Sequence, residues 1–156
     1  MIPIISFWVP GKPEPGGSKK GFARGKHVSI VDANAKAAPW KARVALAASQ
    51  AYRGEPLAGA IHVLFEFVLV RPQGHFGSGK NASNVKPSAP VYPITKPDAL
   101  KLTRSTEDAC TGIIWKDDAI IASQASTKRY GIVTGVRITV YQSMLGLKDK
   151  ICLIDI

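Results

Sequence analysis

Carboxylates gather in one short part of this chain. Five of its eleven acidic residues lie within 21 residues, at Asp98, Glu107, Asp108, Asp117 and Asp118. The rest of the chain is basic, and the formal net charge is +10. A basic surface attracts a polyanion, and neighbouring carboxylates hold a divalent metal against its phosphates. The pattern favours metal-assisted nucleic-acid chemistry, with helix caps and solvated surface charges as the plainer alternative.

Basic side chains are concentrated in the N-terminal third. Residues 1–53 carry nine Lys or Arg against two acids, which makes +7 of the net charge. The segment GKPEPGGSKKGFARGKH (residues 11–27) is rich in glycine and proline, and this composition predicts a flexible basic loop in place of a helix or strand. Such a loop would contact phosphates, with Phe22 stacking on a base, or would serve only as a soluble connector.

Length and composition indicate a single domain spanning residues 1–156. A chain of 156 residues with 46% hydrophobic content builds one core but not two. No apolar run approaches the ~20 residues that a membrane helix requires, and the first ten residues lack signal-peptide features, so we expect an intracellular protein. Cys110 and Cys152 lack metal-ligand spacing, which predicts buried thiols and no zinc site.

The elements that must position the carboxylates are two helices and several strands. Pro39 suits the start of a helix over residues 39–53, and Gly54 its end. Pro97 and Asp98 start a second helix over residues 98–110. The predicted strands are residues 2–9, 60–70, 119–125 and 133–141, with a turn at 128–131. Pro3 confines the first strand to a sheet edge. The apolar tail after residue 142 is expected to pack on the core or on a second subunit.

Residues 71–97 form a long connection with five prolines, four basic side chains and no acid. Connections of this length are usually functional or disordered, and we expect an active-site loop. Within it, GHFGSGKN (residues 74–81) nearly matches the phosphate-binding pattern GxxxxGK[ST]. Asn81 stands where that pattern needs a magnesium-binding hydroxyl, and no helix follows. We therefore predict no nucleotide hydrolase, although His75 and Lys80 remain candidates for a phosphate contact.

The stretch KPDALKLTRSTEDACTGIIWKDDAII resembles the RusA family of phage and prophage Holliday junction resolvases. In that family a PDxDNLxK or PDxDKLxR helix is followed by a DALTG-like end and a W-x-DDAQ segment. The matching motifs here are KPD at 96–98, KLTR at 101–104, EDACTG at 107–112 and WKDDA at 115–119. Weaker similarity extends through VPGKP near the start, the RPQGHFGSGKN loop and the TKRYG segment. The resemblance therefore covers most of the chain.

The resemblance implies a homodimeric, magnesium-dependent endodeoxyribonuclease that cuts four-way DNA junctions symmetrically. It implies an α+β fold with two main helices packed on a small mixed β-sheet. The implied setting is recombination, repair or replication of a phage or prophage genome in the bacterial cytoplasm, with Mn²⁺ as a substitute for Mg²⁺ and with neither membrane nor nucleotide cofactor.

Carried over position by position, the resemblance implies that Asp98 and Asp118, with Asp117 beside it, bind the metal. Arg104 matches the basic residue that follows the helix acids. These assignments agree with the chemistry, because paired carboxylates bind magnesium and a nearby cation stabilises charge that develops on phosphoryl oxygens. The side chains expected to contact DNA are Lys12, Lys19, Lys20, Arg24, Lys26, His75, Lys80, Lys101, Lys128 and Arg129.

Two positions depart from the family pattern. Leu100 stands at the second helix Asp, and Ile120 at the Gln of the DDAQ segment. A leucine cannot bind metal, but Leu100, Arg104 and Glu107 share one helical face, so Glu107 is a candidate for the missing carboxylate, with Asp108 as the other. A surface ion pair with Arg104 is the structural alternative for both acids.

Two rival functions follow from these departures. If no carboxylate compensates for the leucine, the protein is a basic junction-binding module that has lost catalysis. The other rival is an unrelated nucleic-acid-binding domain whose acid stretch only caps a helix and a turn. Metal-dependent cleavage separates the enzyme from both, and preference for branched DNA separates the first rival from the second.

Overall fold

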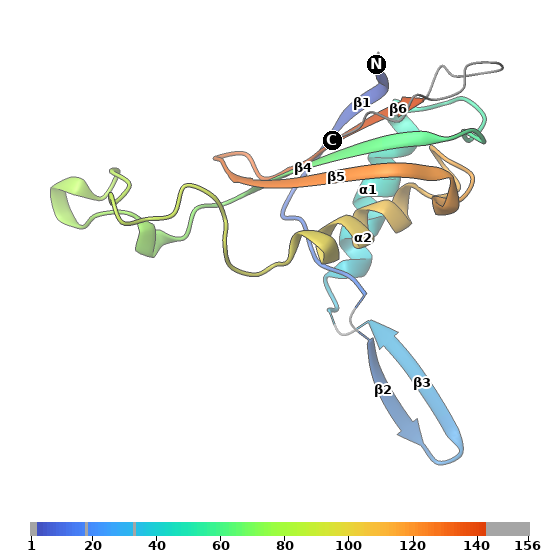
Figure 1. Ribbon diagram of the computed structural model, residues 1–156. Coiled ribbons are helices and arrows are strands. Elements are labelled where there is room, and N and C mark those ends of the chain that lie inside the picture. Colours follow the sequence, from blue (N-terminus) through green and yellow to red (C-terminus); the bar gives the residue numbers. More distant parts are fainter. Residues whose placement is uncertain (1–2, 18, 33, 143–156) are drawn as a thin grey trace, which may run out of the picture.

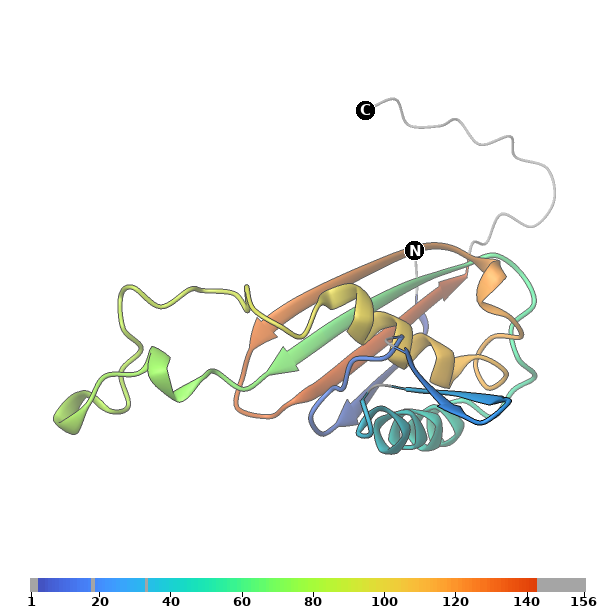
Figure 2. The same ribbon diagram turned by 90° about the horizontal axis from the view of Figure 1, so that it is seen from below.

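The computed structural model describes residues 3–17, 19–32 and 34–142 (Figure 1). A four-stranded sheet carries two helices on one face, and a two-stranded hairpin projects away from both (Figures 1 and 2). The helices are α1 (Ala37–Ala51) and α2 (Ala99–Cys110). The strands are β1 (Pro3–Pro10), β2 (Lys19–Arg24), β3 (His27–Asp32), β4 (Ile61–Leu69), β5 (Ile121–Tyr130) and β6 (Gly135–Gln142). The predicted α+β class is confirmed.

The main sheet is mixed, as expected. Its order is β1-β6-β4-β5, with β4 and β5 parallel and the other pairs antiparallel. Strand β1 lies at an edge, which agrees with the constraint from Pro3. A parallel pair needs a long crossover, and here residues 70–120, including α2, supply it. This crossover brings the start of β5 to the C-terminal end of α2.

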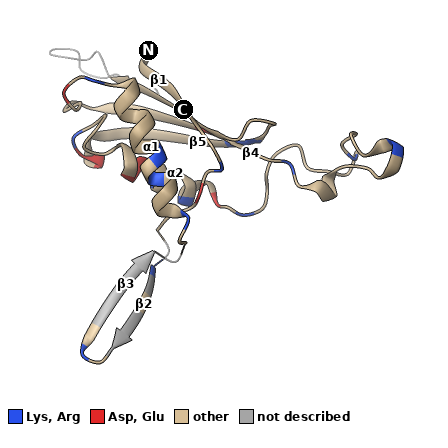
Figure 3. Ribbon diagram, turned by 180° about the vertical axis from the view of Figure 1, so that it is seen from behind, with Lys and Arg blue, Asp and Glu red and all other residues tan. Residues whose placement is uncertain are grey.

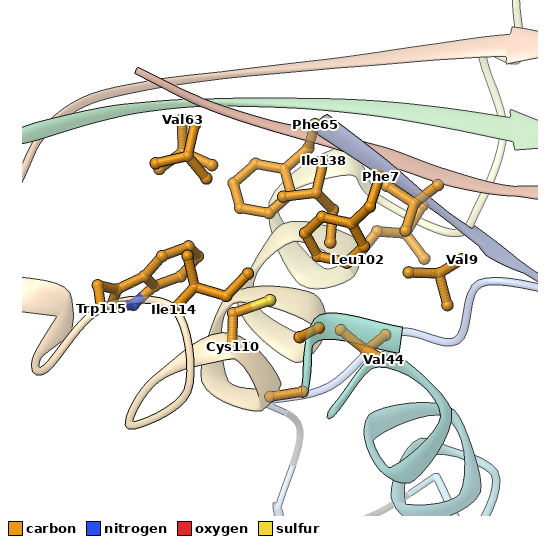
Figure 4. Packing of buried hydrophobic residues seen from close by; sticks show 14 of the residues in the cluster. Phe7, Val9, Val44, Val63, Phe65, Leu102, Cys110, Ile114, Trp115 and Ile138 are labelled. Carbon is orange, nitrogen blue, oxygen red and sulfur yellow. The ribbon is translucent and has the colours of Figure 1, made fainter. Parts of the chain in front are cut away.

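The core lies between the sheet and the two helices (Figure 4). Alternate residues of β4 bury their side chains on the helix side. Helix α1 contributes Trp40, Val44 and Ala48. The Trp40 indole Nε1 donates a hydrogen bond to Thr106 Oγ1 at 3.3 Å, which links the two helices inside the core.

Helix α2 holds the acid stretch in place through its buried face. Leu102, Ala109 and Cys110 are buried, and Gly112 follows the helix with a φ of 80° that suits glycine. The chain then turns through the fully buried Ile114 and Trp115 before it reaches the second pair of acids. The predicted buried thiol of Cys110 is confirmed, and Cys152 lies outside the described residues.

The structure corrects the sequence analysis at several points. Residues 19–32 form the β2–β3 hairpin, so the prediction of a loop over residues 11–27 was wrong from residue 19 onward. Gly25, at φ 63°, opens a two-residue turn, and the β-branched residues of β3 supply strand propensity. Strand β5 runs to Tyr130, so the predicted turn at 128–131 is displaced to residues 131–134. Helix α1 begins at Ala37, two residues before Pro39. The apolar tail lies outside the described residues.

Candidate active site

Two carboxylates lie close enough at the C-terminal end of α2 for one charge to act on the other. Glu107 is half-buried on the helix, and Asp118 opens the short turn that precedes β5. The pKa of Glu107 is raised, first because burial removes water from the carboxylate, and then because the negative charges of Asp118 and Asp108 oppose its ionisation, while Arg104 lowers it. Its Oε2 is buried and has no hydrogen-bond partner within the described part of the chain. A buried carboxylate oxygen without a donor fits a cation ligand.

Asp117 sits next to this pair. Its Oδ1 accepts a hydrogen bond from the Ala119 amide at 2.8 Å, and this bond holds the pKa of the exposed Asp117 carboxyl below its usual range, with a further contribution from a hydrogen bond with Asp118. The turn therefore fixes both neighbouring carboxyl groups at the start of β5. Asp117 is the cap of the turn. Asp118 is the carboxylate of this turn whose charge raises the pKa of Glu107.

Arg104 lies one turn before Glu107 on α2, and its charge acts on the Glu107 carboxylate. Its side chain runs along the backbone of Gly17, where an added Cβ would lie 2.8 Å from Arg104 Cδ. Leu100 is 68% exposed and takes no part in the core, so it is not retained there for packing. The helical face proposed from the sequence is therefore present, with a cation between an apolar residue and a carboxylate.

Asp108 points away from the pair toward α1. Its Oδ2 lies 2.7 Å from Lys41 Nζ in an ion pair that joins the two helices. Lys41 was not among the predicted site residues, because 67 residues separate it from Asp108 and no local spacing connects them. Of the two candidates for the missing carboxylate, Asp108 thus already has an ion-pair partner, whereas Glu107 Oε2 has no hydrogen-bond partner among the described residues.

Asp98 is separated from the carboxylate pair. It caps α2 at the other end, nine residues before Glu107, which corresponds to about 14 Å along the helix axis at 1.5 Å per residue. Its Oδ2 lies 3.8 Å from Lys101 Nζ, and both side chains line a hollow at this end of the helix. Figure 3 shows acidic segments at both ends of α2 with basic segments beside them.

The donors present fit a magnesium ion only in part. Within the described residues, no three His, Cys, Asp or Glu side chains converge tightly enough to hold a metal ion. Glu107 and Asp118 supply two oxygen ligands, and magnesium commonly keeps several waters in its shell. The fit therefore rests on the carboxylate pair and on the buried, unpartnered oxygen of Glu107.

The basic residues predicted to contact DNA are spread over four regions. Lys19, Lys20, Arg24 and Lys26 belong to the projecting hairpin, and Lys12 and Lys101 border the hollow beside Asp98. His75 and Lys80 lie in two short 3₁₀ turns of the 71–97 segment. Lys128 and Arg129 end β5, where Lys128 Nζ donates to the carbonyls of Thr95 and Pro97 at 3.1 and 3.0 Å. Lys128 is therefore a structural tether.

Comparisons with known proteins agree with this architecture. Over 126 residues the chain is 29% identical to the uncharacterized protein YqaN of Bacillus subtilis (strain 168). The aligned region covers 81% of this chain and 87% of that protein. No described helix is long and apolar enough to cross a membrane. Residues 10–141, most of the chain and all of the acid stretch, match the family described as Endodeoxyribonuclease RusA. The chain belongs to the RusA family of endodeoxyribonucleases.

Proposed function

We propose that this protein is a magnesium-dependent, structure-specific endodeoxyribonuclease that resolves four-way DNA junctions as a homodimer. Family membership supplies the nuclease class. The observation that carries the rest is the Glu107–Asp118 pair: a half-buried carboxylate with a raised pKa and an unpartnered oxygen, facing a second carboxylate and flanked by Arg104. In this proposal Glu107 supplies the carboxylate that the family pattern has at the position of Leu100.

Each residue has a separate role in the proposed chemistry. Glu107 and Asp118 would hold the metal, and the turn capped by Asp117 orients Asp118. The chemistry that magnesium supplies when bound is polarisation of the phosphate and a lowered pKa for water. Arg104 would stabilise the negative charge that develops on the phosphoryl oxygens. Asp98, at the other end of α2, would not bind this metal, and its carboxylate lies 3.8 Å from Lys101 Nζ.

The experiment measures cleavage of a four-way junction with and without Mg²⁺ or Mn²⁺. We expect Asp118→Asn and Glu107→Gln each to lower the rate roughly 100-fold or more, because each removes one metal ligand. The matched control is Asp108→Asn, one residue along the same helix, whose carboxylate is paired with Lys41. It should retain activity within a few-fold.

Metal binding is measured separately from cleavage, by the melting temperature in EDTA and in magnesium. A ligand that binds only the folded state raises the melting temperature. Wild type and Asp98→Asn should both gain stability in magnesium, whereas Asp118→Asn and Glu107→Gln should not. If Asp98→Asn abolishes the gain and Glu107→Gln keeps it, the metal lies at the other end of α2 and this assignment fails. Junction binding without any metal-dependent cleavage would identify the non-catalytic rival.

A rescue test addresses the departure at Leu100 directly. Leu100→Asp restores an acid one turn before Arg104, on the face that Glu107 shares. In the Glu107→Gln protein we expect partial recovery of cleavage with the metal displaced along this helical face toward Arg104, because position 100 lies about 10 Å along the helix axis from Glu107 and water fills the rest of a magnesium shell. Leu100→Asn is the matched control, since it adds a polar group of the same size without the charge. Equal rescue by both would contradict the ligand role.

A further inference from the structure

Two adjoining hollows lie at the N-terminal end of α2. Lys12, Pro13, Lys96 and Pro97 line both of them, so we treat them as one feature, the α2 groove. Their volumes are about 410 and 400 Å³. Each falls within the range of about 300–1,000 Å³ that is typical of small-ligand pockets. The α2 groove is separate from the carboxylate pair, which lies at the opposite end of the helix.

The two halves of the α2 groove differ in chemistry. The half beside α2 is charged, and its basic side chains are Lys12, Lys96 and Lys101. The other half is apolar, and its lining includes Leu69, Val70, Pro72, Pro93 and Tyr130. A ligand that complements both halves carries an anionic group at one end and a flat apolar group at the other. A nucleotide has this form, with its phosphate and its base.

The acids on the charged half are already engaged. The Glu14 side chain is only 13% exposed, accepts a hydrogen bond from Asn34 Nδ2 at 3.1 Å and lies 3.7 Å from Lys12 Nζ. Asp98 lies 3.8 Å from Lys101 Nζ. Lys96, at the boundary of the two halves, adds a further positive charge, so this end of the groove favours an anion such as a phosphate.

The walls of the α2 groove are tethered on both sides. The Gly11 amide donates to the Thr134 carbonyl and the Gly16 amide to the Lys101 carbonyl, both at 3.0 Å. Across the groove, Lys128 holds the carbonyls of residues 95 and 97. The Tyr130 ring lies 4.2 Å from the Arg71 guanidinium, which fixes its orientation. A groove held in this way binds a ligand with little ordering cost.

We propose that the α2 groove holds one unpaired nucleotide drawn out of the branched DNA substrate. Its base would lie in the apolar half and its phosphate against the lysines. This proposal rests on the proposed junction substrate and adds a recognition site to it. The roughly 14 Å along α2 between Asp98 and Glu107 equals about four stacked nucleotides at 3.4 Å each. The extruded nucleotide would thus lie a few positions from the cut.

The test uses a four-way junction with 2-aminopurine at the crossover, in EDTA so that no cleavage occurs. Fluorescence of this base rises when it leaves the stack. We expect wild type to raise it several-fold at saturation and to leave 2-aminopurine in a continuous duplex unchanged. Val70→Trp fills the apolar half from a side chain that is 63% exposed, and Lys96→Glu reverses the charge at the boundary. Both variants should return the signal to that of the free junction.

Arg53→Glu is the matched control, because this exposed arginine lines neither half of the groove. The fluorescence with this variant should equal that with wild type. Deoxyadenosine monophosphate, titrated to millimolar concentration, tests for a soluble ligand, and we expect no displacement of the junction signal. An unchanged signal in both groove variants, or displacement by the free nucleotide, would overturn the proposal. Since the assay contains no metal, its outcome is independent of whether the Glu107–Asp118 chemistry is correct.

Discussion

At the scale of single residues, the environment of Glu107 decides what its carboxylate does. Two of the three charged side chains that act on it, Asp118 and Asp108, are acidic, and its buried Oε2 receives no hydrogen bond from the described chain. Asp108, the next residue, has an ion pair with Lys41 and is structurally satisfied. Glu107 and Asp108 are adjacent on one helix but have different surroundings, because they face different elements. Their spacing in the sequence does not specify these surroundings.

The raised pKa of Glu107 predicts a pH-dependent effect on stability. The folded state favours the protonated form, so between the ordinary pKa and the raised pKa the folded protein binds more protons than the unfolded chain, and stability falls as the pH rises through this window. In EDTA at pH 7.5, Glu107→Gln should therefore melt about 1–2 °C above wild type, a small gain because the group is partly exposed.

The same comparison at lower pH supplies its own control. Below about pH 4, where the carboxylate is protonated in both states, the difference in melting temperature should vanish. Asp108→Asn should show the opposite sign at pH 7.5, since it breaks the ion pair with Lys41. A Glu107→Gln protein that melts below wild type at pH 7.5 in EDTA would contradict the environment described for this side chain.

The burial of Cys110 gives a second prediction at this scale. Burial, with the nearby charge of Glu107, raises the pKa of its thiol to about 12, so almost no thiolate exists at neutral pH. In a Cys152→Ser background, we expect no reaction with a thiol reagent at pH 8 in the folded protein and full reaction in urea. Rapid modification of the folded protein would contradict the buried placement.

At the scale of elements, α2 is the part that organises the site. One face packs on α1 and the sheet, and its ends carry the carboxylate pair and the α2 groove. Thr106 ties this helix to α1, since its Oγ1 accepts from the Trp40 indole at 3.3 Å and lies 2.9 Å from the Leu102 carbonyl. Local packing around this bond therefore sets the position of Glu107.

Removing the Thr106 hydroxyl should weaken the fold. Thr106→Val leaves the buried Trp40 N–H without a partner, which costs about 1–3 kcal/mol. Urea unfolding followed by tryptophan fluorescence measures the loss. Thr127→Val is the control, because this residue is exposed on β5 and should change stability by less than about 0.5 kcal/mol. Equal stability of the two variants would mean that the bond contributes nothing.

The β2–β3 hairpin is the other element with a distinct role. It projects from the body, and a two-stranded ribbon fits the major groove of DNA (Figure 1). Reversing Lys19 and Lys20 to Glu should make the slope of log affinity against log salt less steep by about 1–2. A complex with fewer phosphate contacts releases fewer counterions when it forms. An unchanged slope, with Arg53→Glu as the single-charge control, would remove the hairpin from the DNA-facing surface.

At the scale of the whole molecule, symmetric cutting of a junction requires two active sites. One chain supplies one carboxylate pair, so we expect a stable twofold dimer. Strand β5 lies at an open edge of the sheet and is mostly exposed along its length, which leaves room for a partner. Sedimentation at micromolar concentration should give twice the mass of the chain. A monomer at that concentration would contradict symmetric resolution by a dimer.

The sequence by itself determined most of the elements and the chemical class. The alternation of apolar side chains in β4 specifies its buried face, and the motifs around α2 predicted the family, because these features depend on residues close together in the chain. It failed at residues 19–32, where glycine-rich composition outweighed the strand propensity of β3, and at the far end of β5, whose polar residues look like a turn.

Only the tertiary structure decided which acids lie near one another. The crossover between β4 and β5 sets Asp118 beside Glu107 and leaves Asp98 at the far end of α2, although all three belong to one continuous motif. The Lys41 ion pair and the α2 groove likewise join segments that lie tens of residues apart. Such pairings follow from how the elements pack, and packing is set by the whole core, so no local pattern in the sequence specifies them.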